Sequence, residues 1–308
     1  MKDFIIKVAL MTLVSCSVLP IIDIIMLNSV NRWSYYSHER NVFLSYNRLL
    51  SLKDSNKIVI VAGSNGGFGV NSRMINEAFN IPVVNTCTHA SIGTRMQFEM
   101  YKEFLRKGDI VVFCPEYDSG ISRLYGGSVL LRIVSTHLPS AYKKVSFDQW
   151  LYLHKYIGIH FNEVVNCPDD IEEFDGPYSA KAVNEYGDIE WERTHKDSIK
   201  ISKLRGVMDD KLIAYYKYIH NYTKANGIKL VFIPPTFMRS NFKSCAKQID
   251  SLANCLKKNG IPWYSSPSKY SFDDSLYYDT PYHMTQSGAA IRTELLIEDL
   301  REIMNCKE

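Results

Sequence analysis

The sequence predicts an α/β protein whose core is a doubly wound, five-stranded parallel sheet. Three observations lead to this fold class. From residue 57 to the C-terminus, short apolar runs alternate with segments of helical periodicity, which is the pattern of a parallel sheet with helical crossovers. The run IVVF at 110–113 is continuously apolar, as expected for a strand covered on both faces. Finally, a chain of 308 residues that is 46% hydrophobic can bury a core of this size.

The five strands are expected at apolar runs that are separated by turns or helical patterns. They are residues 57–63 (KIVIVAG), 81–87 (IPVVNTC), 109–117 (DIVVFCPEY), 228–235 (IKLVFIPP) and 261–266 (IPWYSS). Helices are expected over residues 71–79, 94–108, 209–227 and 242–260 and again after Thr285. Asn71 or Ser72 can cap the first of these helices, and Gly108 closes the second. In such a sheet the reactive groups gather at the carboxyl ends of the strands.

The regular alternation fails between about 120 and 208. This stretch contains the helix-like segments GGSVLLRIVSTHLPSAYKKV and DQWLYLHKYIGIHF and the turn-like segment NEYGDIEWERTH. It is too long for an ordinary connection, so we interpret it as a mainly helical insertion that forms a lid or a partner surface over the active edge of the sheet.

The N-terminal segment predicts membrane attachment. Between residues 4 and 27, 18 of 24 residues are apolar, which is long enough to cross a bilayer, and Lys2 and Lys7 supply the positive start of a signal sequence. We therefore expect residues 1–27 to form a signal anchor, residues 28–56 a connector, and residues 57–308 a domain outside the cytoplasm, periplasmic or on the cell surface. In the alternative, the LVSC stretch is a lipobox and Cys16 carries the lipid.

Composition limits the classes of partner and cofactor that we expect for this protein. The net charge is +3, from 36 basic and 33 acidic residues without a long basic block, so no nucleic-acid partner is expected. Seven cysteines lack a CxxC pair or metal-ligand spacing, so we expect no metal and no other cofactor, while disulfide pairing stays open.

The stretch GSNGGFG after the first strand allows two interpretations. Gly63, Gly67 and Gly69 fit the GxxxGxG turn of dinucleotide-binding proteins, in which backbone amides face a pyrophosphate. However, Asn85 stands where an acidic ribose-binding residue is expected, and no tyrosine is followed four residues later by a lysine, as a short-chain dehydrogenase requires. A dinucleotide-binding oxidoreductase is therefore a remote alternative.

In the second interpretation the turn displays Ser64 as a nucleophile. A serine hydroxyl needs a histidine to take its proton and an acid to orient that histidine. The segment YYDTPYHMTQSG supplies Asp279 and His283, four residues apart, before the last helix. Because the loops after the first and fifth strands of a parallel sheet open at the same edge, we expect Ser64 and His283 to meet there.

The positions of GSN, of NTCTHASIG and of the terminal Asp/His segment resemble the SGNH (GDSL-type) hydrolase superfamily of esterases, lipases and O-acetyltransferases. From residue 57 to about 305 the chain is similar to a membrane-anchored bacterial subgroup of poorly defined activity that is associated with cell-surface glycans. The resemblance implies that Ser64 is the nucleophile, His283 the general base and Asp279 its orienting acid. It also implies an oxyanion hole formed by the backbone N–H groups of Ser64 and Gly93, and an acylated glycan or an acyl-donor protein as partner.

Two departures from the family pattern affect the expected chemistry. The asparagine that donates to the oxyanion is replaced by the PEY segment with Glu116 and Tyr117, so Tyr117, Asn65 or His89 are the alternative donors. The spacing DxxxH also replaces DxxH. We therefore keep two hypotheses, a serine esterase or O-acyltransferase and a glycan-binding or assembly protein that has lost useful catalysis.

Overall fold

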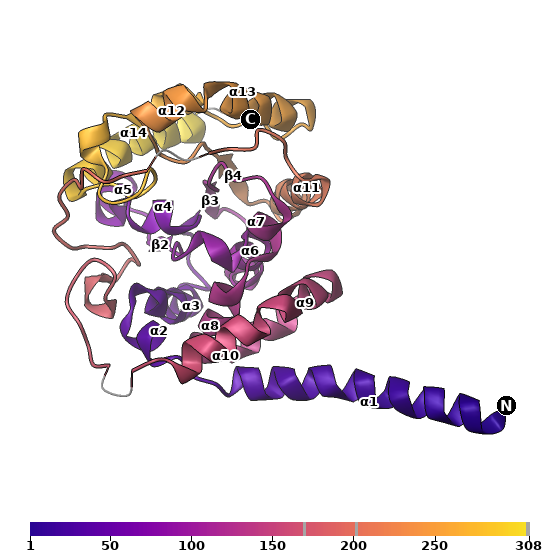
Figure 1. The fold of residues 1–308 in the computed structure, drawn as a ribbon. Helices are drawn as coiled ribbons and strands as arrows, with labels where there is room; N and C mark the ends of the chain where they lie inside the picture. The colour runs from indigo at the N-terminus through magenta and orange to yellow at the C-terminus, as the bar shows by residue number, and fades with distance from the viewer. Residues whose placement is uncertain (169–170, 201–202, 306–308) are drawn as a thin grey trace.

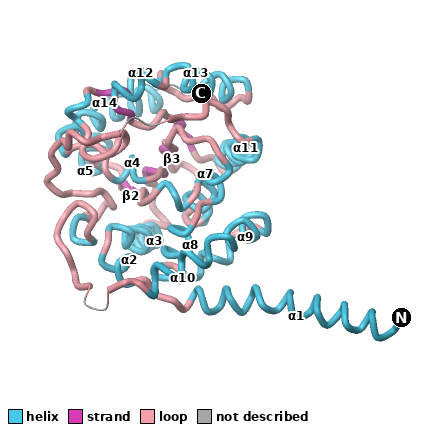
Figure 2. Tube along the Cα trace, viewed as in Figure 1, coloured by secondary structure: helices cyan, strands magenta, loops and turns pink. Residues whose placement is uncertain are grey.

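The computed structural model describes residues 1–168, 171–200 and 203–305, and in the first helix it describes no side chains for residues 12 and 14–16. Helix α1 (Lys2–Leu27) projects from a body in which helices surround a small central sheet (Figures 1 and 2). The predicted mixed α/β architecture is therefore confirmed.

The central sheet has four parallel strands. They are β1 (Ile58–Val61), β2 (Val83–Asn85), β3 (Ile110–Phe113) and β4 (Lys229–Phe232), in the order β2-β1-β3-β4. In the register of the sheet, Ile58 of β1 lies between Val83 of β2 and Ile110 of β3. Each of these strands lies inside a run that the sequence analysis identified.

The expected fifth strand, residues 261–266, does not form. This segment runs beside β4 but makes one backbone hydrogen bond to it, from Tyr264 N–H to the Phe232 carbonyl (2.7 Å). Pro262 has no N–H to continue a ladder, and Gly260 before it has a φ of +75°, which turns the chain out of the extended conformation. Two shorter strands, β5 (Phe237–Met238) and β6 (Ser271–Phe272), pair in parallel as a separate small sheet.

Helices and 3-10 turns make up most of the remaining ordered chain. The α-helices are α2 (Arg32–Tyr36), α3 (Asn41–Ser51), α4 (Ser64–Gly67), α5 (Ser72–Phe79), α6 (Thr94–Glu99), α7 (Ile121–Tyr125), α8 (Ser128–His137), α9 (Phe147–Leu153), α10 (Ile157–Val165), α11 (Asp210–Ala225), α12 (Arg239–Ser244), α13 (Ala246–Lys258) and α14 (Gln286–Asn305). The 3-10 turns are η1 (His38–Arg40), η2 (Ala90–Ile92), η3 (Lys102–Phe104), η4 (Pro139–Lys144), η5 (His154–Tyr156), η6 (Ala180–Ala182), η7 (Pro267–Tyr270) and η8 (Asp274–Leu276).

Two apolar layers cover the two faces of the sheet. On one face Val59, Val61 and Phe113 pack with residues of α6, α8 and α11. On the other face Ile58 and Ile60 pack with residues of α5 and α14. This alternation along β1 explains why the strand reads as a continuous apolar run in the sequence.

The insertion differs from the expected lid in its first half. Leu130, Leu131, Ile133 and Val134 of α8 are fully buried in the core, so this helix is a structural part of the body. The stretch from about 176 to 196 has only the short turn η6 and crosses toward the loop that carries His283. This second part reaches the loop of His283, and Arg123 at the start of the insertion reaches Glu116.

The N-terminal segment forms one helix, α1, whose last turns dock on the body. Asp23 accepts hydrogen bonds from the indole N–H of Trp150 (2.6 Å) and the hydroxyl of Tyr142 (3.1 Å). Lys7 and Asp23 bound a charge-free stretch of residues 8–22. In the described part of the chain, no helix is long and apolar enough to cross a membrane. The membrane anchor over 1–27 thus finds no support here, and Cys16 of the lipoprotein alternative has a side chain outside the described residues.

A buried ion pair generates the first prediction. Lys57 Nζ lies 2.8 Å from Asp109 Oδ2 with both side chains fully buried, and Asp109 also accepts the backbone N–H groups of Lys57 and Arg106. Lys57→Met leaves the carboxylate buried without a cation, so we expect the free energy of unfolding in urea to fall by about 3–5 kcal/mol. Adding Asp109→Asn removes the buried charge and keeps an acceptor for one of the two N–H groups, so it should recover part of this loss. A single variant within about 1 kcal/mol of the wild type would contradict the prediction.

Candidate active site

The turn after β1 positions Ser64 at the carboxyl edge of the sheet. Gly63 precedes Ser64, which opens the one-turn helix α4 and is half-buried. A side chain at Gly63 would collide with the Glu116 carboxylate and would lie 2.7 Å from the Ala90 Cα. The glycine is therefore required because three loops converge on it.

A fully buried arginine of α14 holds the turn in place through hydrogen bonds. Arg292 donates to the Asn65 carbonyl (2.6 Å) and to the Asn65 side-chain oxygen (3.2 Å). Asn65 in turn donates through its side-chain N–H group to the Cys114 carbonyl (3.0 Å) and to Glu116 Oε1 (2.9 Å). The side chain of Asn65, an expected oxyanion donor, is thus fully buried and used in holding the turn.

The structure brings the three expected catalytic side chains together. Ser64 Oγ lies 2.8 Å from His283 Nε2, and His283 Nδ1 lies 2.9 Å from Asp279 Oδ1. With Nδ1–H donating to the carboxylate, Nε2 is the acceptor that faces the serine hydroxyl. The spacing DxxxH therefore allows the same Asp–His contact as a shorter spacing, because Asp279 and His283 lie on one tight loop closed by a hydrogen bond from Tyr278 N–H to the His283 carbonyl (2.8 Å).

Tyr178 from the insertion is a fourth member of this cluster that the sequence analysis missed. Its hydroxyl donates to Asp279 Oδ2 (2.6 Å) and lies 3.1 Å from His283 Nδ1. The ring packs on Phe68 and His38, at centroid distances of 5.1 and 5.3 Å. Residues of the predicted connector hold it in place, since His38 N–H donates to the Tyr178 carbonyl (2.8 Å) and Ser37 pairs with Ser179.

The imidazole of His283 is enclosed by aromatic rings. Phe68 stacks on it with centroids 4.2 Å apart and an interplanar angle of 10°, and His283 is 8% exposed. Burial by itself raises the pKa of the Asp279 carboxyl, but the hydrogen bond and charge of His283 and the hydroxyl of Tyr178 hold that pKa below its ordinary value. Asp279 is thus ready to accept the Nδ1 proton of His283 in a hydrogen bond at neutral pH.

Glu116 occupies the place in which the family resemblance implies an asparagine. It is 5% exposed, and its Oε1 accepts from the Asn65 side chain and lies 3.5 Å from the Asn65 backbone nitrogen. Arg123 of α7 lies 3.6 Å from the other carboxylate oxygen. Glu116 therefore ties α4 to α7, and it brings a carboxylate close to the turn that displays Ser64.

The other residues that were expected to donate to the oxyanion are Gly93, Tyr117 and His89. Gly93 N–H donates to the Ala90 carbonyl (3.1 Å), so it is engaged. Tyr117 is 2% exposed and lies in a separate apolar cluster with Phe237. The His89 Nδ1 accepts from Ser91 N–H (3.0 Å), and burial lowers the pKa of His89, so its neutral form carries a proton on Nε2.

The backbone N–H groups of Ser64 and Ala90 are candidate oxyanion donors instead. In the described part of the chain no acceptor lies against the N–H of Ser64 or of Ala90. Ala90 packs against Gly63, the residue before Ser64. These two groups can donate to a reacting carbonyl oxygen without breaking an existing hydrogen bond.

Among the described residues, no group of three or more histidine, cysteine, aspartate or glutamate side chains is arranged to hold a metal ion.

Comparison of the chain with protein-family models, with curated proteins and with solved structures found no match.

Gly63 provides a prediction for the site. Gly63→Ala places a methyl group against Glu116 and Ala90, so we expect a loss of about 1–3 kcal/mol in the free energy of unfolding and slower reaction of Ser64 with an active-site serine phosphonate. Gly158→Ala is the matched control, because nothing lies within 4 Å of a side chain at Gly158 and alanine is the better helix former there. Wild-type stability and labelling in Gly63→Ala would contradict the crowded turn.

Proposed function

We propose that this protein is a serine esterase or O-acyltransferase of the SGNH type that transfers or removes an acyl group, such as acetyl, on a cell-surface glycan. The observation that carries the proposal is the chain of contacts from Ser64 Oγ through the imidazole of His283 to Asp279. A serine in a turn needs no such chain for packing, and a Ser–His–Asp arrangement is the recurring device of acyl transfer.

The geometry supports a two-step reaction. His283 Nε2 takes the Ser64 proton as Oγ bonds to the ester carbonyl carbon, and the carbonyl π electrons move to its oxygen. Collapse of this adduct breaks the carbon–oxygen bond to the alcohol, which receives the proton from His283. Water or a sugar hydroxyl then attacks the acyl-serine, giving its proton to His283, and Ser64 recovers a proton as it leaves. Hydrolysis and transfer differ only in that second acceptor.

The backbone N–H groups of Ser64 and Ala90 would stabilise the oxyanion in this reaction. Loss of one such donor costs about 3 kcal/mol in acyl-transfer enzymes, so the replacement of the family asparagine matters. The second candidate function, a glycan-binding or assembly protein without useful catalysis, is favoured by one observation. The buried carboxylate of Glu116 lies 3.5 Å from the Asn65 amide nitrogen, next to the serine turn, where negative charge opposes an oxyanion.

The same carboxylate disfavours the dinucleotide alternative, because a pyrophosphate at this turn would meet a buried negative charge. The location outside the cytoplasm and the glycan substrate come from the family resemblance and from the N-terminal sequence. They stay parts of the proposal.

Ser64 provides the decisive test. Purified full-length protein should hydrolyse p-nitrophenyl acetate and should be labelled at Ser64 by a serine phosphonate, as located by peptide mass spectrometry. Ser64→Ala should lower the hydrolysis rate by about 10³-fold or more while leaving the fold intact by circular dichroism. Folded wild-type protein that is neither labelled nor active would overturn the enzyme proposal in favour of the binding protein.

Tyr178 provides a second prediction at the same site. Tyr178→Phe keeps the ring contacts but removes the hydroxyl that stabilises the Asp279 anion, so the pKa of Asp279 should rise toward its ordinary value. Without this donor Asp279 also becomes a stronger partner for the His283 proton, so the acidic limb of the profile of kcat/KM against pH should move to higher pH, with kcat reduced about tenfold by looser positioning. Tyr152→Phe is the control, because its hydroxyl contacts Tyr156 and no group of the cluster. An unchanged pH profile would limit Tyr178 to packing.

A further inference from the structure

Arg193, in the second part of the insertion, is a buried cation whose hydrogen-bond partners are all backbone carbonyls. It is 5% exposed. Its Nε–H group donates to the Met284 carbonyl (3.1 Å), and one terminal nitrogen donates to the Phe68 carbonyl (3.3 Å). The other terminal nitrogen donates to the carbonyls of Ile189 (2.6 Å) and Trp191 (3.2 Å). The guanidinium therefore joins three segments, which are the end of α4, the loop before α14 and the insertion.

The charge of Arg193 has no carboxylate partner in the described part of the chain. Burial lowers the pKa of its guanidinium to about 10, so the group is still cationic at neutral pH. The charges of Asp188 and Asp279 act in the opposite direction, but neither carboxylate forms an ion pair with it. An apolar side chain of similar volume would avoid the cost of burying this charge. Stability alone therefore does not account for a guanidinium at this place.

Two of the groups that Arg193 holds are direct neighbours of the general base. Phe68 stacks on the imidazole of His283 with centroids 4.2 Å apart, and the guanidinium carbon of Arg193 lies 5.4 Å from the centroid of the Phe68 ring. Met284 is the residue after His283 in the chain. The same guanidinium thus fixes the ring that packs on the imidazole and the backbone that follows it.

The rest of the stretch 189–196 bridges the same two elements. Near its start, Ile189 N–H donates to the Gly67 carbonyl (2.9 Å) at the end of α4. At its end, Lys196 N–H donates to the Tyr278 carbonyl (2.8 Å) in the loop before α14. The buried arginine lies between these two contacts in the chain, so it is the side chain that closes the insertion onto the candidate active site.

The four carbonyls require the shape of an arginine. A guanidinium presents five N–H donors in a rigid planar fork, whereas a lysine ammonium has three donors on a single nitrogen. Different parts of the fork serve different segments here, since Nε–H reaches Met284 and the terminal nitrogens reach Phe68 and the insertion. A lysine at this position could hold only part of the arrangement.

We propose that Arg193 is a positioning residue for the reaction at Ser64. It locks the stretch 189–196 against the loop of the general base and so keeps His283 Nε2 within reach of the serine hydroxyl, 2.8 Å away. This inference rests on the proposed acyl-transfer function. Arg193 acts through the ring and the backbone beside the imidazole, and two of its four acceptors belong to the insertion. The position of the general base therefore depends on docking of the insertion.

Kinetics of full-length variants test this role. Arg193→Met removes every donor and keeps a long apolar side chain. Each rate of p-nitrophenyl acetate hydrolysis is divided by the concentration of Ser64 that a serine phosphonate labels at completion, so that misfolded protein does not affect kcat. We expect kcat to fall about 10- to 100-fold with KM within about twofold of the wild type, because His283 serves both steps of the reaction.

Two further variants define the arginine's part. Arg193→Lys keeps the charge and some of the donors, so it should lower kcat less, about three- to tenfold. Arg73→Met is the matched control, because Arg73 of α5 also contacts the insertion, at Glu185 (4.0 Å) and Glu190 (3.8 Å), but through exposed side chains. Its kcat should stay within about twofold of the wild type.

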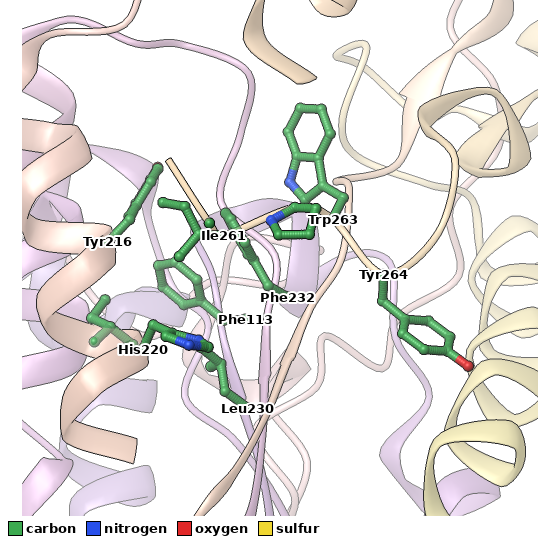
Figure 3. A pocket seen from close by; sticks show the side chains of 11 residues that line it. Phe113, Tyr216, His220, Leu230, Phe232, Ile261, Trp263 and Tyr264 are labelled. Carbon is green, nitrogen blue, oxygen red and sulfur yellow. The ribbon is translucent and has the colours of Figure 1, made fainter. Parts of the chain in front are cut away.

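Leu230→Ala is the control for a loss of stability alone. Leu230 lines an apolar cavity of about 380 Å³ beside β4, and none of the residues that line this cavity belongs to the stretch 189–196 or to the catalytic cluster (Figure 3). We expect this variant to lower the temperature of thermal unfolding by at least about 2–4 °C without a change in kcat.

Several outcomes would overturn the positioning role. One is a wild-type kcat in folded Arg193→Met, which would limit the arginine to stability, and another is an equal loss of kcat in Arg73→Met or Leu230→Ala. If Arg193→Met does not fold, a wild-type kcat in Arg193→Lys overturns the role equally. These results leave the proposed function intact, whereas folded wild-type protein without labelling of Ser64 would refute that function and this inference with it.

Discussion

The tight turn after β1 is the constraint on which the rest of the structure depends. Gly63 has room for no side chain because Glu116 and Ala90 approach it from the ends of neighbouring elements. This tight turn places Ser64 at the carboxyl edge of the sheet. Arg292 holds the next residue, Asn65, by a hydrogen bond to its carbonyl. Since the hydrogen bond from Ser64 to His283 joins residues 219 positions apart, it can form only if the first strand and the last loop open at the same edge.

The surroundings of His283 explain how a loop residue is held for chemistry. Phe68 restricts the ring from one side, and Asp279 and Tyr178 hold its Nδ1 side through hydrogen bonds. Tyr178 belongs to the insertion and is itself fixed by His38 of the predicted connector. Segments that lie outside the alternating strand and helix pattern therefore complete the site, and they do so by preorganising the general base instead of contacting the nucleophile.

Sequence reasoning reached those features that depend on local pattern. The strands at 58–61 and 110–113 follow from continuous apolar runs, and the Asp279–His283 pair follows from the chemistry that a nucleophilic serine requires. It failed where tertiary context decides. Pro262 ended the expected fifth strand, and the N–H of Gly93 is used within its own turn. Tyr178 gave no signal, because one tyrosine among 20 in an irregular insertion has no periodicity that marks it.

A series of aromatic contacts links the segment that was expected as the fifth strand to the loop of His283. Trp263, which stands where that strand was expected, packs on Tyr117 at 5.5 Å, and Tyr117 packs on Phe237 at 5.3 Å. Phe237 packs in turn on Tyr282, the residue before His283, at 4.8 Å. The segment that stands where the fifth strand was expected is therefore the end of a continuous aromatic cluster that supports the His283 loop.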